Sequence, residues 1–138
     1  MIQCLNNFMN SLDKAAELRR RTKSFAIRIV NLFRSLPRSP DAQTRGKQLL
    51  RSGTSVGANY RAVCRARSQA EFIARMGIVV EEADESVFWL ELLGETGVIS
   101  PTRTQDLLKE ANELVRILGA SLRTSKNGVK CLNVSMIQ

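Results

Sequence analysis

Apolar residues recur at alternating steps of three and four along most of this chain, a spacing that places them on one side of an α-helix. The first such stretch begins at Ser11, a residue type that caps helix N-termini, and it stops before Pro37. Its stripe is Ala15, Leu18, Thr22, Phe25, Ile29, Leu32 and Leu36. The pattern predicts an amphipathic helix over about residues 11–36.

Three further stretches carry the same period, and each has its own start signal. The stripe of the second is Ala42, Gly46, Leu49, Gly53, Val56, Tyr60 and Val63, and that of the fourth is Leu107, Ala111, Leu114, Leu118 and Leu122. Ser39-Pro40 and Ser100-Pro101 pair a capping serine with a proline in the first turn. Ser68 and Glu71 form a capping box, in which serine and glutamate satisfy backbone N–H groups of the first turn. We therefore predict helices at about 40–66, 68–95 and 100–125. Four helices with short connections predict an all-α fold, an up-down-up-down antiparallel four-helix bundle.

The ends of the chain lack these signals. Residues 1–10 have no firm period and predict a flexible N-terminal arm, and Asn127-Gly128 is typical of a helix C-terminus. The predicted organisation is an arm at 1–10, a bundle at 11–126 and a loose tail at 127–138. The second helix also contains glycines at 46, 53 and 57 on its packing side. They indicate either close approach by a neighbouring helix or a local unwinding.

The third predicted helix has two apolar sides. Phe72, Met76, Val79, Ala83 and Leu90 fall on the side expected to pack in the bundle. A solvated opposite side would not gather large apolar residues around two acids. Either another part of the chain covers this second side, or it is a subunit interface, which we take as the hypothesis. The candidate interface residues are Ile78, Glu81, Glu85, Phe88, Trp89 and Leu92.

The charges are segregated along the chain. Residues 11–67 hold fourteen Lys/Arg and three Asp/Glu, whereas residues 68–99 hold one and seven. Lys47, Arg51, Arg61 and Arg65 share one side of the second helix, so this basic side could pair head-to-tail with the acidic, apolar side of the third helix in another copy. Such a chain can bind itself or nucleic acid.

Four segments resemble a known family: TSVGANYR at 54–61, SQAEF at 68–72, EEADES at 81–86 and WLELL at 89–93. They are similar to the bacterial four helix bundle protein family, also called the ribosomal RNA intervening-sequence protein family, over roughly residues 11–125. The resemblance implies a four-helix bundle that assembles as a ring-shaped homopentamer and has no established enzymatic activity. A similar bundle is the accessory protein of diversity-generating retroelements, which engages nucleic acid and a reverse transcriptase. Many members have Ile-Ala-Glu after the asparagine, where this chain has Tyr60-Arg61-Ala62.

Catalytic and metal-binding chemistry finds no support in the residues. The chain has no histidine, and its three cysteines are far apart, so zinc and Cys–His sites are not expected. The acids at 81–85 point around the helix rather than converging, which disfavours a carboxylate metal site. We expect no catalytic residues, no metal and no cofactor. No apolar run is long enough to span a membrane and no signal peptide is evident, so we expect a cytoplasmic protein.

The clustered cations are either an ordinary solvated face or a site for nucleic acid, whose phosphates such clusters neutralise with little sequence preference. We take nucleic acid as the expected ligand. The leading hypothesis is a non-enzymatic, ring-forming bundle that acts as a binding or scaffold module for RNA or DNA. The alternative is an adaptor that recruits a partner protein and uses its basic charge in self-association. The candidate nucleic-acid-binding residues are Arg19, Arg20, Arg21, Lys23, Lys47, Arg51, Arg61 and Arg65.

Overall fold

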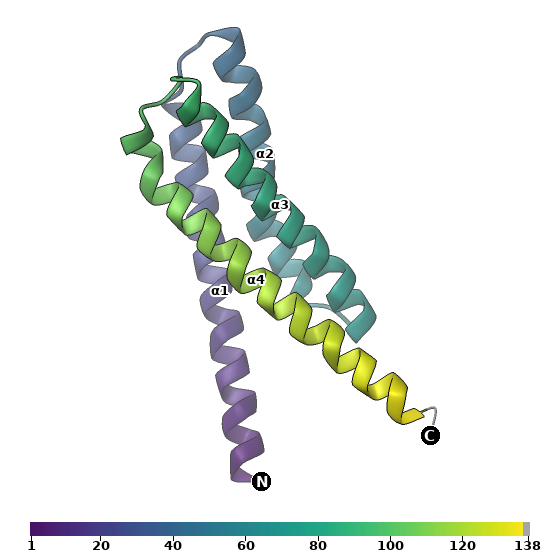
Figure 1. Cartoon of the computed structure of the whole chain (residues 1–138). Helices are drawn as coiled ribbons and strands as arrows, with labels where there is room; N and C mark the ends of the chain where they lie inside the picture. The colour runs from purple at the N-terminus through teal and green to yellow at the C-terminus, as the bar shows by residue number, and fades with distance from the viewer. Residues whose placement is uncertain (137–138) are drawn as a thin grey trace.

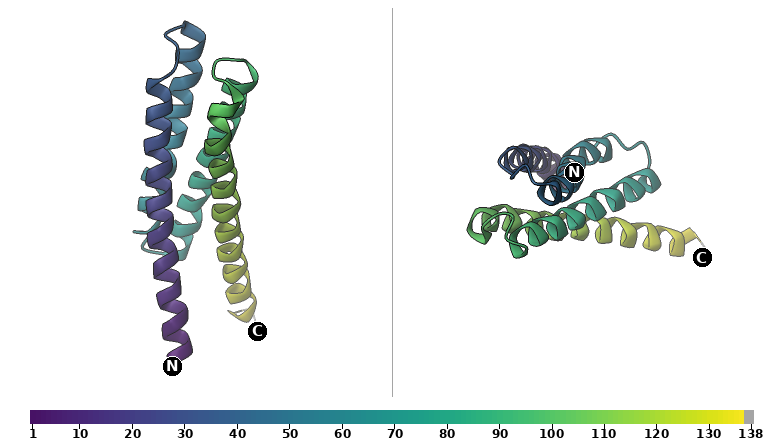
Figure 2. Two further views of the ribbon diagram at one scale, coloured as in Figure 1. Left: turned by 90° about the vertical axis from the view of Figure 1, so that its left-hand side faces the viewer. Right: turned by 90° about the horizontal axis from the view of Figure 1, so that it is seen from above.

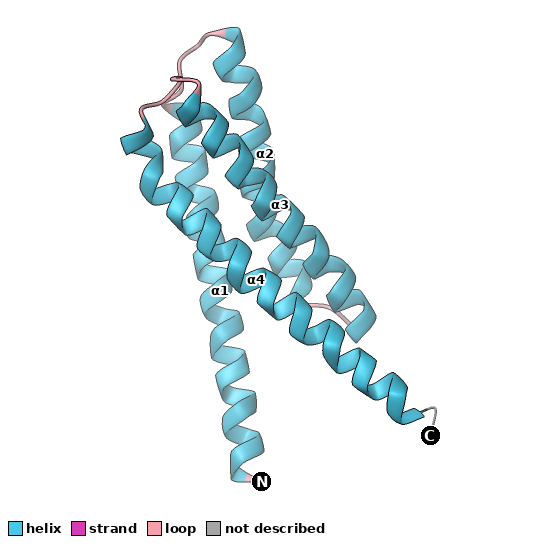
Figure 3. Cartoon of the chain, viewed as in Figure 1, coloured by secondary structure: helices cyan, strands magenta, loops and turns pink. Residues whose placement is uncertain are grey.

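The computed structural model of the chain describes residues 1–136, and it describes side chains as far as residue 128. Four helices follow one another: α1 (Ile2–Arg34), α2 (Pro40–Val63), α3 (Gln69–Glu95) and α4 (Pro101–Met136). Short loops join them, and residues 1–136 contain no strand (Figures 1 and 3). The predicted all-α four-helix bundle is confirmed. None of the helices in the described part of the chain combines the length and the apolar character needed to cross a membrane.

The predicted apolar stripes of the four helices pack together in one hydrophobic core. On α2, all seven residues of the predicted stripe are buried, from Ala42 at one end to Val63 at the other. The apolar side of α3 that was assigned to the bundle is buried from Met76 to Leu90, and Leu107 to Leu118 cover it from α4. The period of apolar residues therefore identified the packing side of each helix correctly, because burial of one face is the main stabilising term for helices in a bundle.

The glycines of α2 allow α1 to approach closely. A Cβ atom at Gly53 would lie 2.8 Å from Cγ1 of Ile29, and one at Gly57 would lie 3.2 Å from the carbonyl oxygen of Thr22. The helix runs without interruption from Pro40 to Val63, so the alternative of a local unwinding is wrong. Small residues at these positions set the distance between the two helices.

The capping signals are partly confirmed. The Ser68 side chain accepts a hydrogen bond of 3.0 Å from the Glu71 N–H, as predicted, and the Glu71 carboxylate accepts one of 2.8 Å from the backbone N–H of Arg67. Ser39 precedes α2 in an extended conformation but its side chain makes no capping bond, so Pro40 marks the start of this helix by its conformation.

The predicted boundaries of the outer helices are wrong. Helix α1 begins at Ile2 rather than at Ser11, and α4 continues through Asn127 and Gly128 to Met136. A glycine costs a helix only about 1 kcal/mol, which is too little to end one when its neighbours favour it. Of the predicted tail, residues 137–138 lie outside the described residues, and the flexibility of both terminal segments stays a prediction.

Consecutive helices pack along most of their length, but α1 and α4 do not. These two helices touch over a short stretch and then diverge, so that both project beyond α2 and α3 at the same end of the bundle (Figures 1 and 2). Arg21 of α1 makes one of these contacts, since its guanidinium bonds Glu110 at 3.0 and 3.1 Å and lies 3.1 Å from Glu113. Arg103 of α4 makes another with Ser35, which follows α1, at 3.0 Å. The bundle is closed at one end and open at the other.

Candidate nucleic-acid interface

A groove of about 560 Å³ runs between α1 and α2, and five cationic side chains line it. We call it the basic groove. Its floor is made of small residues, among them Ala16, Gly57 and Ala58, and no acid lines it. Its cations come from the two clusters that the sequence placed on separate helices, and they are Arg19, Arg20, Lys23, Arg61 and Arg65.

The groove exists because of how α1 and α2 are spaced. Gly57 lies in its floor and lets the backbone of α2 approach that of Thr22. The long cationic side chains then border a shallow depression, with their charged ends exposed to solvent. With no carboxylate among the lining residues, the positive potential of the five cations is not cancelled locally.

Two further arginines extend the basic surface beyond the groove. A neighbouring hollow of about 480 Å³ shares Arg61 and Arg65 and adds Arg67 and Arg75, at the junction of α2 and α3. Glu71 also lines this hollow, and its pKa is lowered by the Arg67 N–H bond and by Arg75, whose Nε lies 2.9 Å from the carboxylate. Neither arginine was among the predicted binding residues, and because Arg75 is paired with Glu71, Arg67 is the one that adds an available cation. The sequence did offer a signal, because Arg67 directly precedes the capping box and Arg75 lies one helical turn after Glu71.

Arg21 was predicted as a binding residue, and the structure places it elsewhere. It lies on the side of α1 that faces α4, where its ion pairs with Glu110 and Glu113 leave 26% of its side chain exposed. A guanidinium engaged by two carboxylates is a poor partner for phosphate. Its role is to join α1 to α4.

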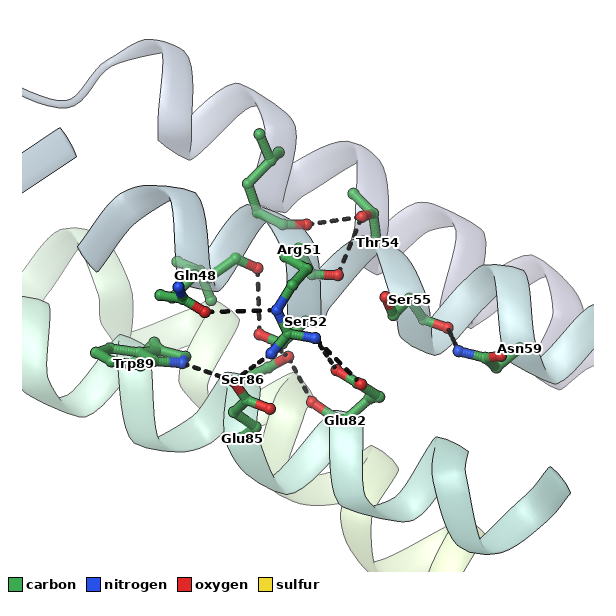
Figure 4. A network of polar contacts seen from close by, with 12 residues as sticks. Gln48, Arg51, Ser52, Thr54, Ser55, Asn59, Glu82, Glu85, Ser86 and Trp89 are labelled. Carbon is green, nitrogen blue, oxygen red and sulfur yellow. Dashed lines mark hydrogen bonds and ion pairs between the residues drawn. The ribbon is translucent and has the colours of Figure 1, made fainter. Parts of the chain in front are cut away.

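Arg51 is also engaged within the chain, and the expected pairing between copies stays a prediction. Its guanidinium bonds both carboxylate oxygens of Glu82, at 3.2 and 3.1 Å, and also bonds Glu85 (Figure 4). Glu85 in turn accepts a bond of 3.1 Å from the indole N–H of Trp89, and the two donors, Arg51 first, lower the pKa of Glu85. Lys47, the remaining candidate, is exposed and does not line the basic groove.

The second side of α3 is partly open, and we call it the rear face. The side chains of Ile78 and Phe88 are 46% and 52% exposed, and the Phe88 ring meets Trp89 edge-on with centroids 4.9 Å apart. Glu81 is exposed, while Glu85, Trp89 and Leu92 are half-buried. Contacts with Arg51 therefore cover the part of the rear face around Glu85 and Trp89. Ile78 and Phe88 form an apolar surface that the described residues leave exposed.

The comparisons with known proteins agree with this architecture. Residues 14–120 match the profile of the family described as 23S rRNA-intervening sequence protein. A crystal structure from Bacteroides thetaiotaomicron VPI-5482, described as a protein with unknown function from the S23 ribosomal protein family, is 36% identical. The similarity covers 76% of this chain and 97% of that chain, with a TM-score of 0.71. No curated protein matches the chain.

Proposed function

The chain belongs to the 23S rRNA-intervening sequence protein family, and from that premise we propose that it is a non-enzymatic bundle that binds nucleic acid through the basic groove. The observation that carries the proposal is the convergence of five cations from two helices around a depression that no acid lines. The family description names an intervening sequence of ribosomal RNA, which makes RNA the first ligand to test.

The chemistry of the groove favours phosphate contacts over base recognition. Its floor of alanine, glycine, threonine and cysteine offers no aromatic ring on which a base could stack. Arginine side chains bind phosphate oxygens bidentately, and such contacts carry little sequence information. Binding is therefore expected to be strongly salt-dependent and weakly sequence-dependent.

A salt-titrated binding assay tests this proposal. If a duplex neutralises the five cations of the groove, log Kobs falls with log salt at a slope of about 4.5, a loss of about 500-fold between about 50 and 200 mM salt. In the double variant Arg61→Gln/Arg65→Gln, three cations remain and the slope falls to about 2.7, a loss of about 40-fold over the same range. Fluorescence anisotropy with labelled RNA and DNA, duplex and single-stranded, measures both.

The matched control removes two charges from the same helix outside the groove. Lys47→Gln/Arg51→Gln has the same net charge as the groove variant, and its slope should stay near that of the wild type. Absence of binding even at low salt would refute the proposal. An equal loss in both double variants would show that net charge, rather than the groove, governs binding.

We further propose that the chain assembles with copies of itself through the rear face of α3, as the ring-shaped homopentamers of the resembling family imply. Exposed aromatic and aliphatic side chains suit the centre of an interface, and the acids beside them suit its polar rim. Light scattering on Phe88→Asp tests this, with Asn31→Asp as a control that adds the same charge on an exposed position of α1. A wild type that is monomeric over the whole concentration range contradicts the assembly.

The second candidate function is a protein adaptor, and the exposure of Ile78 and Phe88 favours it. In that case the oligomeric ring recruits a partner polypeptide and nucleic acid does not bind. The two candidates are separated by the anisotropy assay together with the oligomeric state. A multimer without affinity for RNA or DNA at low salt supports the adaptor.

A further inference from the structure

The first helix begins with an exposed segment, and this segment carries an apolar stripe. Every side chain from residue 1 to residue 14 is exposed, and this segment projects beyond α2 and α3 (Figure 1). Apart from Met1, the large apolar residues on it range from 48% to 77% exposed. They recur at helical spacing and form what we call the arm stripe: Ile2, Leu5, Phe8, Met9 and Leu12.

An unfilled groove lies where α1 and α4 diverge, and we call it the terminal groove. It measures about 730 Å³ and lies between the divergent halves of these two helices. Side chains from three helices give it an apolar base: Tyr60 of α2, Phe72 and Met76 of α3 and Ile117 of α4. Tyr60 and Met76 belong to the bundle core, so the groove is a place where the core reaches the surface.

The arm stripe cannot fill the terminal groove of its own chain. The α1 residues that line this groove include Asn7, Lys14 and Arg21, which lie one above another at steps of seven. At 100° per residue, the mean direction of the groove-lining residues of α1 and that of the arm stripe are roughly 180° apart. One helix therefore bears an apolar stripe on one side and borders an apolar groove on the other.

We propose that the arm stripe of one copy lies in the terminal groove of a neighbouring copy of this chain. Because the two surfaces are on opposite sides of α1, they cannot meet reciprocally across a two-fold axis. The contact is heterologous, head-to-tail, and such contacts close into a ring when the rotation permits. The arm stripe lies outside residues 14–120, the part of the chain that matches the family.

The charges of the two surfaces are compatible with this contact. Residues 1–12 contain no acidic or basic side chain, so inserting them in the groove buries no side-chain charge from the arm. The rim of the groove holds Lys14, Glu17 and Arg21, of both signs, at positions where they can remain in water. A second helix with an uncharged apolar stripe is the occupant that this groove suits.

The proposal rests on self-association but not on nucleic-acid binding, and cross-linking tests it directly. In a background with Cys4, Cys64 and Cys131 replaced by serine, Leu5→Cys and Ser121→Cys are made separately and together. A short bismaleimide should join unlike single variants when they are mixed, and should give a ladder of covalent oligomers with the double variant. Cross-links between two Leu5→Cys copies, cross-links within one double-variant chain, or none at all would each overturn the proposal.

Light scattering gives a second, independent measurement. Leu5→Asp should reduce the molar mass relative to Asn6→Asp, which adds the same charge off the stripe. Both variants should retain the helical content of the wild type, because Leu5 and Asn6 are exposed. Both variants keep the five cations of the basic groove, so loss of assembly and loss of nucleic-acid binding are distinguishable. Equal molar masses for the two variants, or a monomeric wild type, would overturn the proposal.

Discussion

Replacing glycine by alanine should change the stability of this bundle in opposite directions at two helical positions, Gly77 of α3 and Gly53 of α2. In a helix interior, alanine is favoured over glycine by about 1 kcal/mol because the glycine backbone loses more freedom on folding. At Gly77 an added Cβ meets no atom within 4 Å, so this gain should be obtained in full.

At Gly53 the same methyl group enters occupied space. It would lie 2.8 Å from Cγ1 and 3.0 Å from Cγ2 of Ile29, a side chain that is fully buried. Isoleucine is branched at Cβ and rotates little, so the clash must be relieved by moving α1 away from α2. Overpacking of this kind costs about 1–3 kcal/mol, which exceeds the propensity gain and leaves a net loss of up to about 2 kcal/mol.

Urea unfolding followed by circular dichroism, at one protein concentration for all variants, measures the difference. The Gly77→Ala and Gly53→Ala variants should differ by about 1–3 kcal/mol, or by about 4–12 °C in Tm for a chain of this length. In an Ile29→Ala background, Gly53→Ala should become stabilising, since the obstructing atoms are gone. If Gly53→Ala stabilises the wild type as much as Gly77→Ala does, the close packing of α1 on α2 is wrong.

Other predictions concern single contacts. Arg51 and Trp89 hold the pKa of Glu85 in the folded chain below its ordinary 4.5. The stability that these contacts contribute is therefore complete above pH 4.5 and is lost as the pH falls through the lowered pKa. Trp89 fluorescence should report this transition, and Arg51→Gln should make the pH dependence weaker. Ser68→Ala removes the capping bond at the start of α3 and should cost about 1 kcal/mol, measured by urea unfolding. Leu114→Ala leaves a cavity at a fully buried position and should cost about 2–5 kcal/mol, whereas a value near zero would show that α4 does not complete the core.

Local signals accounted for much of the fold. The period of apolar residues identified the packing side of all four helices, and Ser68 with Glu71 identified the start of α3. These features depend on residues within one or two turns of each other, which a sequence displays directly. The helix ends were less accessible, because the positions of Ser11 and Gly128 suggest boundaries that the flanking turns of helix override.

The charged residues show what a sequence cannot supply. Helical spacing placed Arg51 on the same side of α2 as Arg61 and Arg65, and it grouped Arg21 with its neighbours in α1. Only the packing of α3 on α2 and of α4 on α1 brought carboxylates to Arg51 and Arg21. The same packing left five other cations together in one groove, and Lys47 outside it.

By itself, then, the sequence determined the class of fold, the core side of each helix and the segregation of positive and negative charge along the chain. The tertiary structure decided which cations are paired and which remain available, and it opened the groove between α1 and α4 beside the exposed arm. The physical reason is that a periodic pattern determines which residues share a side of a helix. Which helix lies opposite that side depends on how all four pack together, through contacts between residues far apart in the chain.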